Sequence, residues 1–108
     1  MILCMTTNCN NACGKIKITE KDTGTLAEIF KSLGHPVRIK IVAALMDGER
    51  CVCELQRIAE RDISTVSSHL NLLKSTGILA CEQRGKQVFY RLKRICLAKI
   101  FSCLLSEK

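Results

Sequence analysis

Cysteine is the residue type with the clearest chemical potential in this sequence, because eight of the 108 residues are cysteines. Cys51 and Cys53 are separated by one residue where a turn leads into a predicted helix. A helix N-terminus stabilises thiolates, so both thiols are expected to have a lowered pKa. Cys9 and Cys13 are four residues apart, so a helix would place them on one face, and a loop could also bring them together. Thiolates are soft ligands that prefer zinc, cadmium, lead, arsenic(III) or copper(I) to hard cations.

The other cysteines have weaker signals. Cys4 is a further candidate ligand near the N-terminus, and Cys81 lies in a predicted strand, where we expect it to pack. Cys96 and Cys103 are seven residues apart and therefore share one face of the last predicted helix. They could form a second thiolate site, but we expect packing there too. For Cys51 and Cys53 the alternative is that both side chains simply pack. For Cys9 and Cys13 the alternative is an arm whose thiols bind nothing.

Length and apolar pattern exclude several classes of protein. A chain of 108 residues forms one domain. The longest apolar run, residues 41–46, is far shorter than a membrane helix, and the first residues lack the basic region of a signal peptide. We therefore expect a cytoplasmic protein with no membrane association, in a reducing environment where structural disulfides are rare.

Positive charge is concentrated in the second half of the chain. The net charge is +7, of which residues 1–60 contribute +1 (8 basic, 7 acidic) and residues 61–108 contribute +6 (9 basic, 3 acidic). A basic half-domain is typical of a protein that binds the phosphate backbone of nucleic acid, although a merely solvated basic surface would show the same balance.

The pattern of apolar residues predicts the elements that position these groups. Residues 1–24 show no sustained apolar period and are predicted to be a cysteine-containing arm, with the folded domain in residues 25–108. Helices are expected around residues 26–33, from Pro36 to Asp47, from near Cys53 to Ala59, and from an N-cap at Ser64 to Gly77. Strands at 78–83 and 87–92 form a hairpin with a basic tip, and a last apolar helix follows. That helix is a candidate dimer seam, although packing within one protomer is equally compatible.

This order of elements is that of a winged helix-turn-helix, a mainly α fold with a small β-hairpin (α+β). Residues 53–76 would form the helix-turn-helix, whose second helix enters the major groove of double-stranded DNA. Arg84 and Lys86 on the hairpin, or wing, would contact phosphates or the minor groove. The predicted DNA-contacting residues are Ser64, Thr65, Ser67, Ser68, His69, Asn71, Lys74, Arg84 and Lys86.

Several segments together resemble the ArsR/SmtB family of metal-responsive repressors, and the similarity spans about residues 26–105. They are Leu33-Gly34-His35-Pro36-Val37-Arg38, Glu49-Arg50-Cys51-Val52-Cys53-Glu54-Leu55, Ser67-Ser68-His69-Leu70, Leu73-Lys74, Gly77-Ile78-Leu79 and Arg84-Gly85-Lys86 followed by Tyr90-Arg91-Leu92. The resemblance implies a homodimeric winged-helix repressor that leaves its operator DNA when an inducing ion binds.

The resemblance also implies a ligand set. In the family the Cys-Val-Cys segment supplies metal ligands, and in the cadmium- and lead-responsive branch two arm cysteines complete the site. Here the corresponding residues are Cys51 and Cys53 with Cys9 and Cys13. Four thiolates suit Cd(II), Pb(II) or Zn(II), and three of them suit As(III), Sb(III) or Bi(III). No organic cofactor is expected.

One departure from the family and three rival functions remain. Some members bind zinc with Asp and His on their C-terminal helices, but this stretch has Cys96, no histidine and only Glu107 as an acid. A redox- or persulfide-sensing repressor on the same fold would use the same cysteines. A winged helix that binds protein around a structural zinc is a second rival. An enzyme is not expected, because neither histidine lies near a cysteine in a catalytic arrangement.

Overall fold

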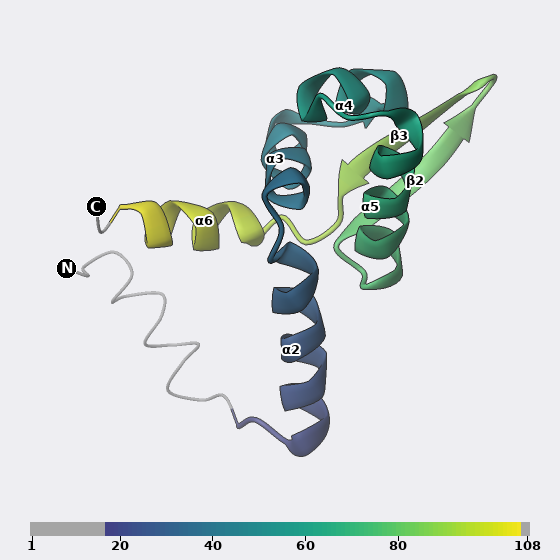
Figure 1. Ribbon diagram of the computed structural model, residues 1–108. Coiled ribbons are helices and arrows are strands. Elements are labelled where there is room, and N and C mark those ends of the chain that lie inside the picture. Colours follow the sequence, from purple (N-terminus) through teal and green to yellow (C-terminus); the bar gives the residue numbers. More distant parts are fainter. Residues whose placement is uncertain (1–16, 107–108) are drawn as a thin grey trace.

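The computed structural model describes residues 17–106 and places a three-stranded sheet beside a group of helices (Figure 1). The helices are α2 (Glu20–Leu33), α3 (Pro36–Ala44), α4 (Val52–Ala59), α5 (Ile63–Ser75) and α6 (Leu97–Leu105), and a 3-10 turn, η1, covers Leu45–Asp47. The strands are β1 (Arg50–Cys51), β2 (Leu79–Arg84) and β3 (Gln87–Leu92). The predicted winged helix-turn-helix architecture is confirmed. No helix within residues 17–106 is both long and apolar enough to span a bilayer.

The core lies where α3, α4 and α5 meet the base of the sheet. Its most deeply buried side chains are Ile41, Val42, Leu55, Val66, Leu70, Leu73 and Ile78, all essentially inaccessible to solvent. The predicted inward face of α5, which carries Val66, Leu70 and Leu73, is therefore confirmed. Because that face is fixed in the core, the opposite face of α5 must point outward.

The sheet has the order β1-β3-β2, and both pairs are antiparallel. The hairpin of β2 and β3 was expected, and Leu79 pairs with Leu92 at its base while Arg84 pairs with Gln87 at its tip. The short strand β1 was not expected. It pairs Arg50 with Tyr90 and Cys51 with Phe89, so the segment before α4 is hydrogen-bonded to the wing.

Several element boundaries differ from the sequence predictions. Helix α2 begins at Glu20, inside the segment assigned to the arm, because Thr19 and Asp22 form a reciprocal capping box there. Helix α5 begins at Ile63 with Asp62 as its N-cap, and the prediction of Ser64 as the cap is wrong. Pro36 occupies the first turn of α3, as expected, and Gly77 adopts a left-handed conformation with φ of 80° after α5.

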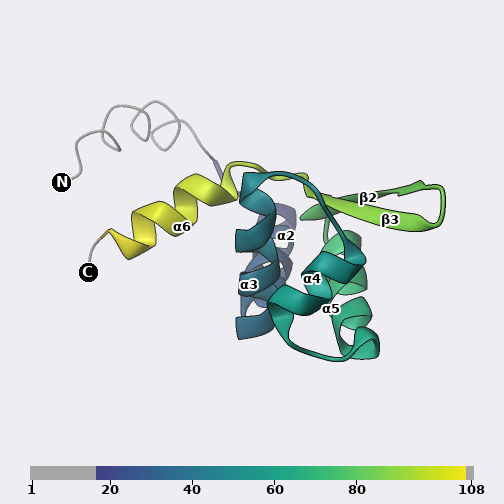
Figure 2. The same cartoon turned by 90° about the horizontal axis from the view of Figure 1, so that it is seen from above.

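The outer helices bury less than their apolar pattern suggests. On α2, Leu33 is buried but Leu26 and Phe30 are exposed, and on α6 Leu97 is buried but Leu104 is exposed. Helix α6 extends from the body on the side opposite to the wing, as Figures 1 and 2 show. The structure therefore leaves apolar side chains exposed on both outer helices, and α6 carries its share on the side opposite to the wing.

Candidate DNA-binding surface and thiol pair

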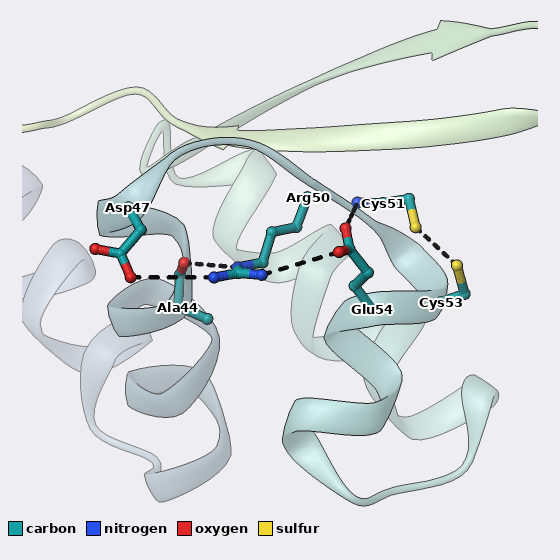
Figure 3. Close-up of polar contacts among 6 residues, drawn as sticks. All are labelled: Ala44, Asp47, Arg50, Cys51, Cys53 and Glu54. Atoms are coloured by element: carbon teal, nitrogen blue, oxygen red, sulfur yellow. Dashed lines mark hydrogen bonds and ion pairs between the residues drawn. The ribbon is translucent and has the colours of Figure 1, made fainter.

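The thiols of Cys51 and Cys53 lie side by side at the start of α4, with their sulfur atoms 2.7 Å apart (Figure 3). Cys51 is the N-cap residue of α4 and also belongs to β1, which buries its side chain. Cys53, in the first turn of the helix, is exposed. The structure therefore brings the two thiols together, with Cys51 buried and Cys53 exposed.

A carboxylate fixes the backbone beneath the two thiols. Glu54 accepts a hydrogen bond from the backbone N–H of Cys51, with N and Oε1 3.1 Å apart. Arg50 contacts Glu54 at 3.9 Å and Asp47 at 4.0 Å, and its Nε donates to the carbonyl oxygen of Ala44 at 2.9 Å. Arg50 therefore connects the end of α3 to the first turn of α4, as Figure 3 shows.

The expectation of a lowered pKa for both thiols is wrong for Cys53. The hydrogen bond that it shares with Cys51 raises the pKa of the Cys53 thiol, and desolvation raises it further. Two sulfur atoms this close favour sharing a proton over forming two thiolates, and this outweighs the helix N-terminus. A bound cation would replace that proton, because coordination deprotonates a thiol.

The thiol pair supplies only two ligands of the predicted site. Among residues 17–106, no group of three or more His, Cys, Asp or Glu side chains is arranged to hold a metal ion. Cys4, Cys9 and Cys13 lie outside the described residues. Two convergent soft donors with one exposed sulfur fit part of a thiophilic site, and any further ligand must come from elsewhere.

The other three cysteines lie away from this pair. Cys81 is half-buried on β2 and packs against the core, as expected. It also contacts Tyr90, whose pKa is raised chiefly by burial and in part by Cys81. Cys103 is half-buried on α6, but Cys96 is exposed at the N-cap of that helix, so the expectation that Cys96 packs is wrong.

The outward face of α5 carries the polar residues that were predicted to contact DNA. Ser64, Ser68, Asn71 and Lys74 are exposed, and Thr65, Ser67 and His69 are partly exposed. Thr65 is held by Asp62, which accepts hydrogen bonds from its backbone N–H at 3.2 Å and its hydroxyl at 2.7 Å. The hydroxyl and backbone N–H of Thr65 lower the pKa of Asp62. Asp62 was not among the predicted residues, although an aspartate just before an apolar-periodic segment is a recognisable helix start.

His69 is held in a contact between helices and is not free on the outer face. Its Nδ1 accepts a hydrogen bond from Nε of Arg38 at 3.1 Å, and its ring lies 4.6 Å from that of His35. Desolvation lowers the pKa of His69, and the nearby positive charges of His35, Arg38 and Arg61 lower it further. Arg38 also donates to the carbonyl of Ser32 at 3.2 Å, so this cluster joins α5 to the junction of α2 and α3.

The two predicted cations of the wing have different surroundings. Arg84 contacts Glu49 at 2.7 Å and Glu82 at 3.0 Å, and its guanidinium carbon lies 4.8 Å from the centroid of the Phe89 ring. The hydrogen bond from Arg84 lowers the pKa of Glu49. The carboxylates of Glu49 and Glu82 in turn raise the pKa of Arg84. The side chain of Lys86, at the exposed tip, makes no hydrogen bond or ion pair with any residue from 17 to 106.

Comparisons with known proteins agree with this arrangement. Residues 35–80 match the family described as "Bacterial regulatory protein, arsR family". The cadmium resistance transcriptional regulatory protein CadC of Listeria innocua is 39% identical over 82 residues, which are 75% of this chain and 69% of that protein. The HTH-type transcriptional repressor SmtB of Mycobacterium tuberculosis is 41% identical over 73 residues, 68% of this chain and 54% of that protein.

A solved structure shows the same architecture. The crystal structure of the transcriptional repressor BigR from Xylella fastidiosa is similar to this chain with a TM-score of 0.72 and 34% sequence identity. The similarity covers 81% of this chain and 89% of that one.

Proposed function

Because the chain belongs to the ArsR family of bacterial regulatory proteins, we propose that it is a homodimeric repressor that leaves its operator DNA when a thiophilic ion binds Cys51 and Cys53. The family consists of transcriptional regulators and not of enzymes. The observation that carries the proposal is the 2.7 Å contact between the two sulfur atoms at the start of α4. That helix is the first of the helix-turn-helix, so an ion held there acts on the element that positions α5.

The DNA-binding half of the proposal rests on α5 and the wing. Helix α5 is anchored by its buried face and presents Ser64, Ser68, Asn71 and Lys74 outward. These side chains can donate to and accept from base edges in the major groove and phosphates beside it. The excess positive charge of residues 61–108 lies on the same half of the chain and favours the phosphate backbone.

The ion-binding half rests on the chemistry of the donors. Two thiolates select soft ions, and the name of the similar CadC protein refers to cadmium resistance. Cys9 and Cys13, with Cys4 as a further candidate, are the proposed residues that complete the site. Four sulfurs suit Cd(II), Pb(II) or Zn(II), whereas three suit As(III), Sb(III) or Bi(III).

The connection between the ion and the DNA runs through contacts of Cys51. This residue caps α4 and pairs with Phe89 of the wing, so a shift of its sulfur moves both parts of the DNA-binding surface. Release of DNA requires the ion to bind the low-affinity conformation more tightly, with a coupling free energy of about 1–3 kcal/mol.

The proposed homodimer has suitable surfaces on α2 and α6. Leu26 and Phe30 on α2, and Ile100, Leu104 and Leu105 on α6, are apolar side chains that are exposed in the single chain. Exposed apolar faces of this kind are typical of interfaces between subunits. A dimer would present two α5 helices to successive major grooves.

The test is a titration under anaerobic conditions. Fluorescently labelled promoter DNA bound to the reduced protein is titrated with Zn(II), Cd(II), Pb(II), As(III), Sb(III) and Bi(III), and anisotropy reports release. A Cys51→Ser/Cys53→Ser variant should bind the DNA and ignore every ion, whereas a Cys96→Ser control should respond as the wild type does. Release from the double variant at wild-type ion concentrations would show that the site lies elsewhere.

The contact between the two sulfurs also favours one alternative, a redox or persulfide sensor on the same fold. An oxidant of the peroxide class would take two electrons and two protons from Cys51 and Cys53 as their sulfurs join. Release of DNA by peroxide, with no release by any of the six ions under anaerobic conditions, would favour this alternative.

A further inference from the structure

An open groove of about 400 Å³ lies between the start of α4, the first turns of α5 and the wing. The two thiols line it together with groups from the other elements. The residues that matter here are Cys51, Cys53, Gln56, Ser67, Lys86 and Gln87. The thiol pair therefore opens onto the space between the two elements that are proposed to hold DNA, and not onto a separate part of the surface.

The lining of this groove suits an anion. Its one charged side chain is Lys86, and no carboxylate belongs to the lining. Gln56, Ser67 and Gln87 add hydrogen-bond donors on three sides. Lys86 has no ionic or hydrogen-bonding partner within residues 17–106, in contrast to Arg84, which two carboxylates hold. The lining also includes the apolar side chains of Val52, Ile63 and Val88, so Lys86 is its one ionic contact for a phosphodiester oxygen and the neutral polar groups add hydrogen bonds.

We propose that this groove receives a segment of the sugar-phosphate backbone of bound duplex DNA, so that an ion on Cys51 and Cys53 and the DNA compete for the same space. The inference rests on the proposed function. When α5 lies in the major groove and the wing contacts the backbone or the minor groove beyond it, the intervening strand passes between the two elements. Ser67 from α5 and Lys86 from the wing face that passage from its two sides.

The proposal adds a direct component to the release of DNA. A conformational change of α4 lowers the affinity of a site that stays open, whereas an ion in the groove occupies the position of a phosphate group. Because Cys53 is exposed and Cys51 is buried, the outer sulfur is the one that the backbone would cover. Bulk placed on residue 53 should therefore oppose DNA binding even when no ion is present.

The first measurement is protection of thiols by DNA. The reduced protein is alkylated with N-ethylmaleimide, with and without a duplex carrying the region upstream of its own gene, and peptide mass spectrometry gives the rate at each cysteine. With free DNA at about ten times the Kd found by anisotropy, only about a tenth of the protein is free, so Cys53 should react about tenfold more slowly. The exposed Cys96, at the N-cap of α6, is the internal control and should react at an unchanged rate.

The second measurement places a bulky side chain at residue 53 in the absence of any ion. Cys53→Trp should weaken DNA binding several-fold, and Cys96→Trp is the matched control. Circular dichroism confirms that each variant is folded. Unchanged alkylation of Cys53 in a complex that anisotropy shows to be saturated, or wild-type affinity of Cys53→Trp, would overturn the shared groove and leave the proposed repressor intact. Failure of the reduced wild type to bind the duplex would overturn both.

Discussion

Glu49 and Arg84 form a two-pronged ion pair between the loop before β1 and the end of β2, with nitrogen–oxygen distances of 2.7 and 2.8 Å. Glu49 lies two residues before Cys51, and Arg84 lies at the tip of the wing. The pair therefore connects the thiol-bearing segment to the wing, in addition to the backbone pairing of β1 with β3. A contact with Glu82 at 3.0 Å holds the guanidinium of Arg84 from the other side.

The first prediction separates the two cations of the wing. The salt dependence of DNA binding becomes less steep by about 0.9 in the logarithmic slope for each phosphate that the protein no longer neutralises. Lys86→Ala should reduce the slope by this amount for each protomer that contacts the DNA. Arg84→Ala should change the slope less, because Glu49 and Glu82 already balance its charge. Binding isotherms over a range of salt concentrations measure both slopes.

A control for nonspecific charge effects is Lys99→Ala on α6, on the opposite side from the wing. It should leave the slope at the wild-type value. Equal changes for Arg84→Ala and Lys86→Ala would mean that Arg84 leaves its carboxylates and binds a phosphate in the complex.

The second prediction concerns the protonation of His69. Its neutral form is favoured in the folded protein, so its folded pKa lies below the ordinary value of 6.5. Between those two pKa values the unfolded chain binds the proton and the folded chain does not, so stability falls as the pH falls through this window. The stabilisation that the folded protein gains from a neutral His69 is fully present above pH 6.5. NMR titration of the imidazole ring should give a pKa below 6.5.

The Arg38→Gln variant tests the cause of this shift. Removal of the guanidinium, which donates to Nδ1 and repels the imidazolium, should raise the pKa of His69 toward its ordinary value. A control variant, Lys40→Gln, removes a charge from the same helix and should have no such effect. A His69 pKa that is unaffected by Arg38→Gln would assign the whole shift to desolvation and to the remaining neighbours.

The third prediction concerns the start of α5. Asp62→Ala removes the side chain that accepts from the backbone N–H and the hydroxyl of Thr65, so it should lower the urea midpoint without changing the slope of the transition. Ser64→Ala, one residue inside the helix and exposed, should change stability by less than about 0.5 kcal/mol. A larger loss of stability for Ser64→Ala than for Asp62→Ala would contradict the observed cap.

Local pattern was sufficient for most of the fold. The spacing of Val66, Leu70 and Leu73 predicts the buried face of α5 because burial follows the period of the helix. The hairpin likewise follows from alternation around a Gly-containing turn. The same kind of reasoning could predict Asp62 as the N-cap of α5. Ser64 offers similar capping chemistry two residues later, so local pattern alone does not separate the two residues.

Features that depend on distant parts of the chain could not be predicted from the sequence. Strand β1 has only two residues, and it exists because Cys51 meets Phe89. A segment so short has no period of its own. The contact between Arg38 and His69, and that between Arg84 and Glu49, likewise join residues more than thirty positions apart. The groove shared by the thiols and the wing lies beside the pairing of β1 with β3, so it emerges only from the assembled fold.

The fourth prediction concerns the apolar faces that the outer helices leave exposed. Leu104 is 67% exposed on α6 and Phe30 is 57% exposed on α2, and the homodimer proposed above would cover both. Burying an unpaired carboxylate costs several kcal/mol, and about 1.4 kcal/mol is tenfold in affinity, so Leu104→Glu should raise the dimer dissociation constant by roughly a hundredfold. Ile63→Gln changes an apolar residue that is 47% exposed on α5, away from these faces, and should leave the dimer intact. Sedimentation equilibrium measures both constants. A wild-type constant for Leu104→Glu would exclude this face of α6 from the interface.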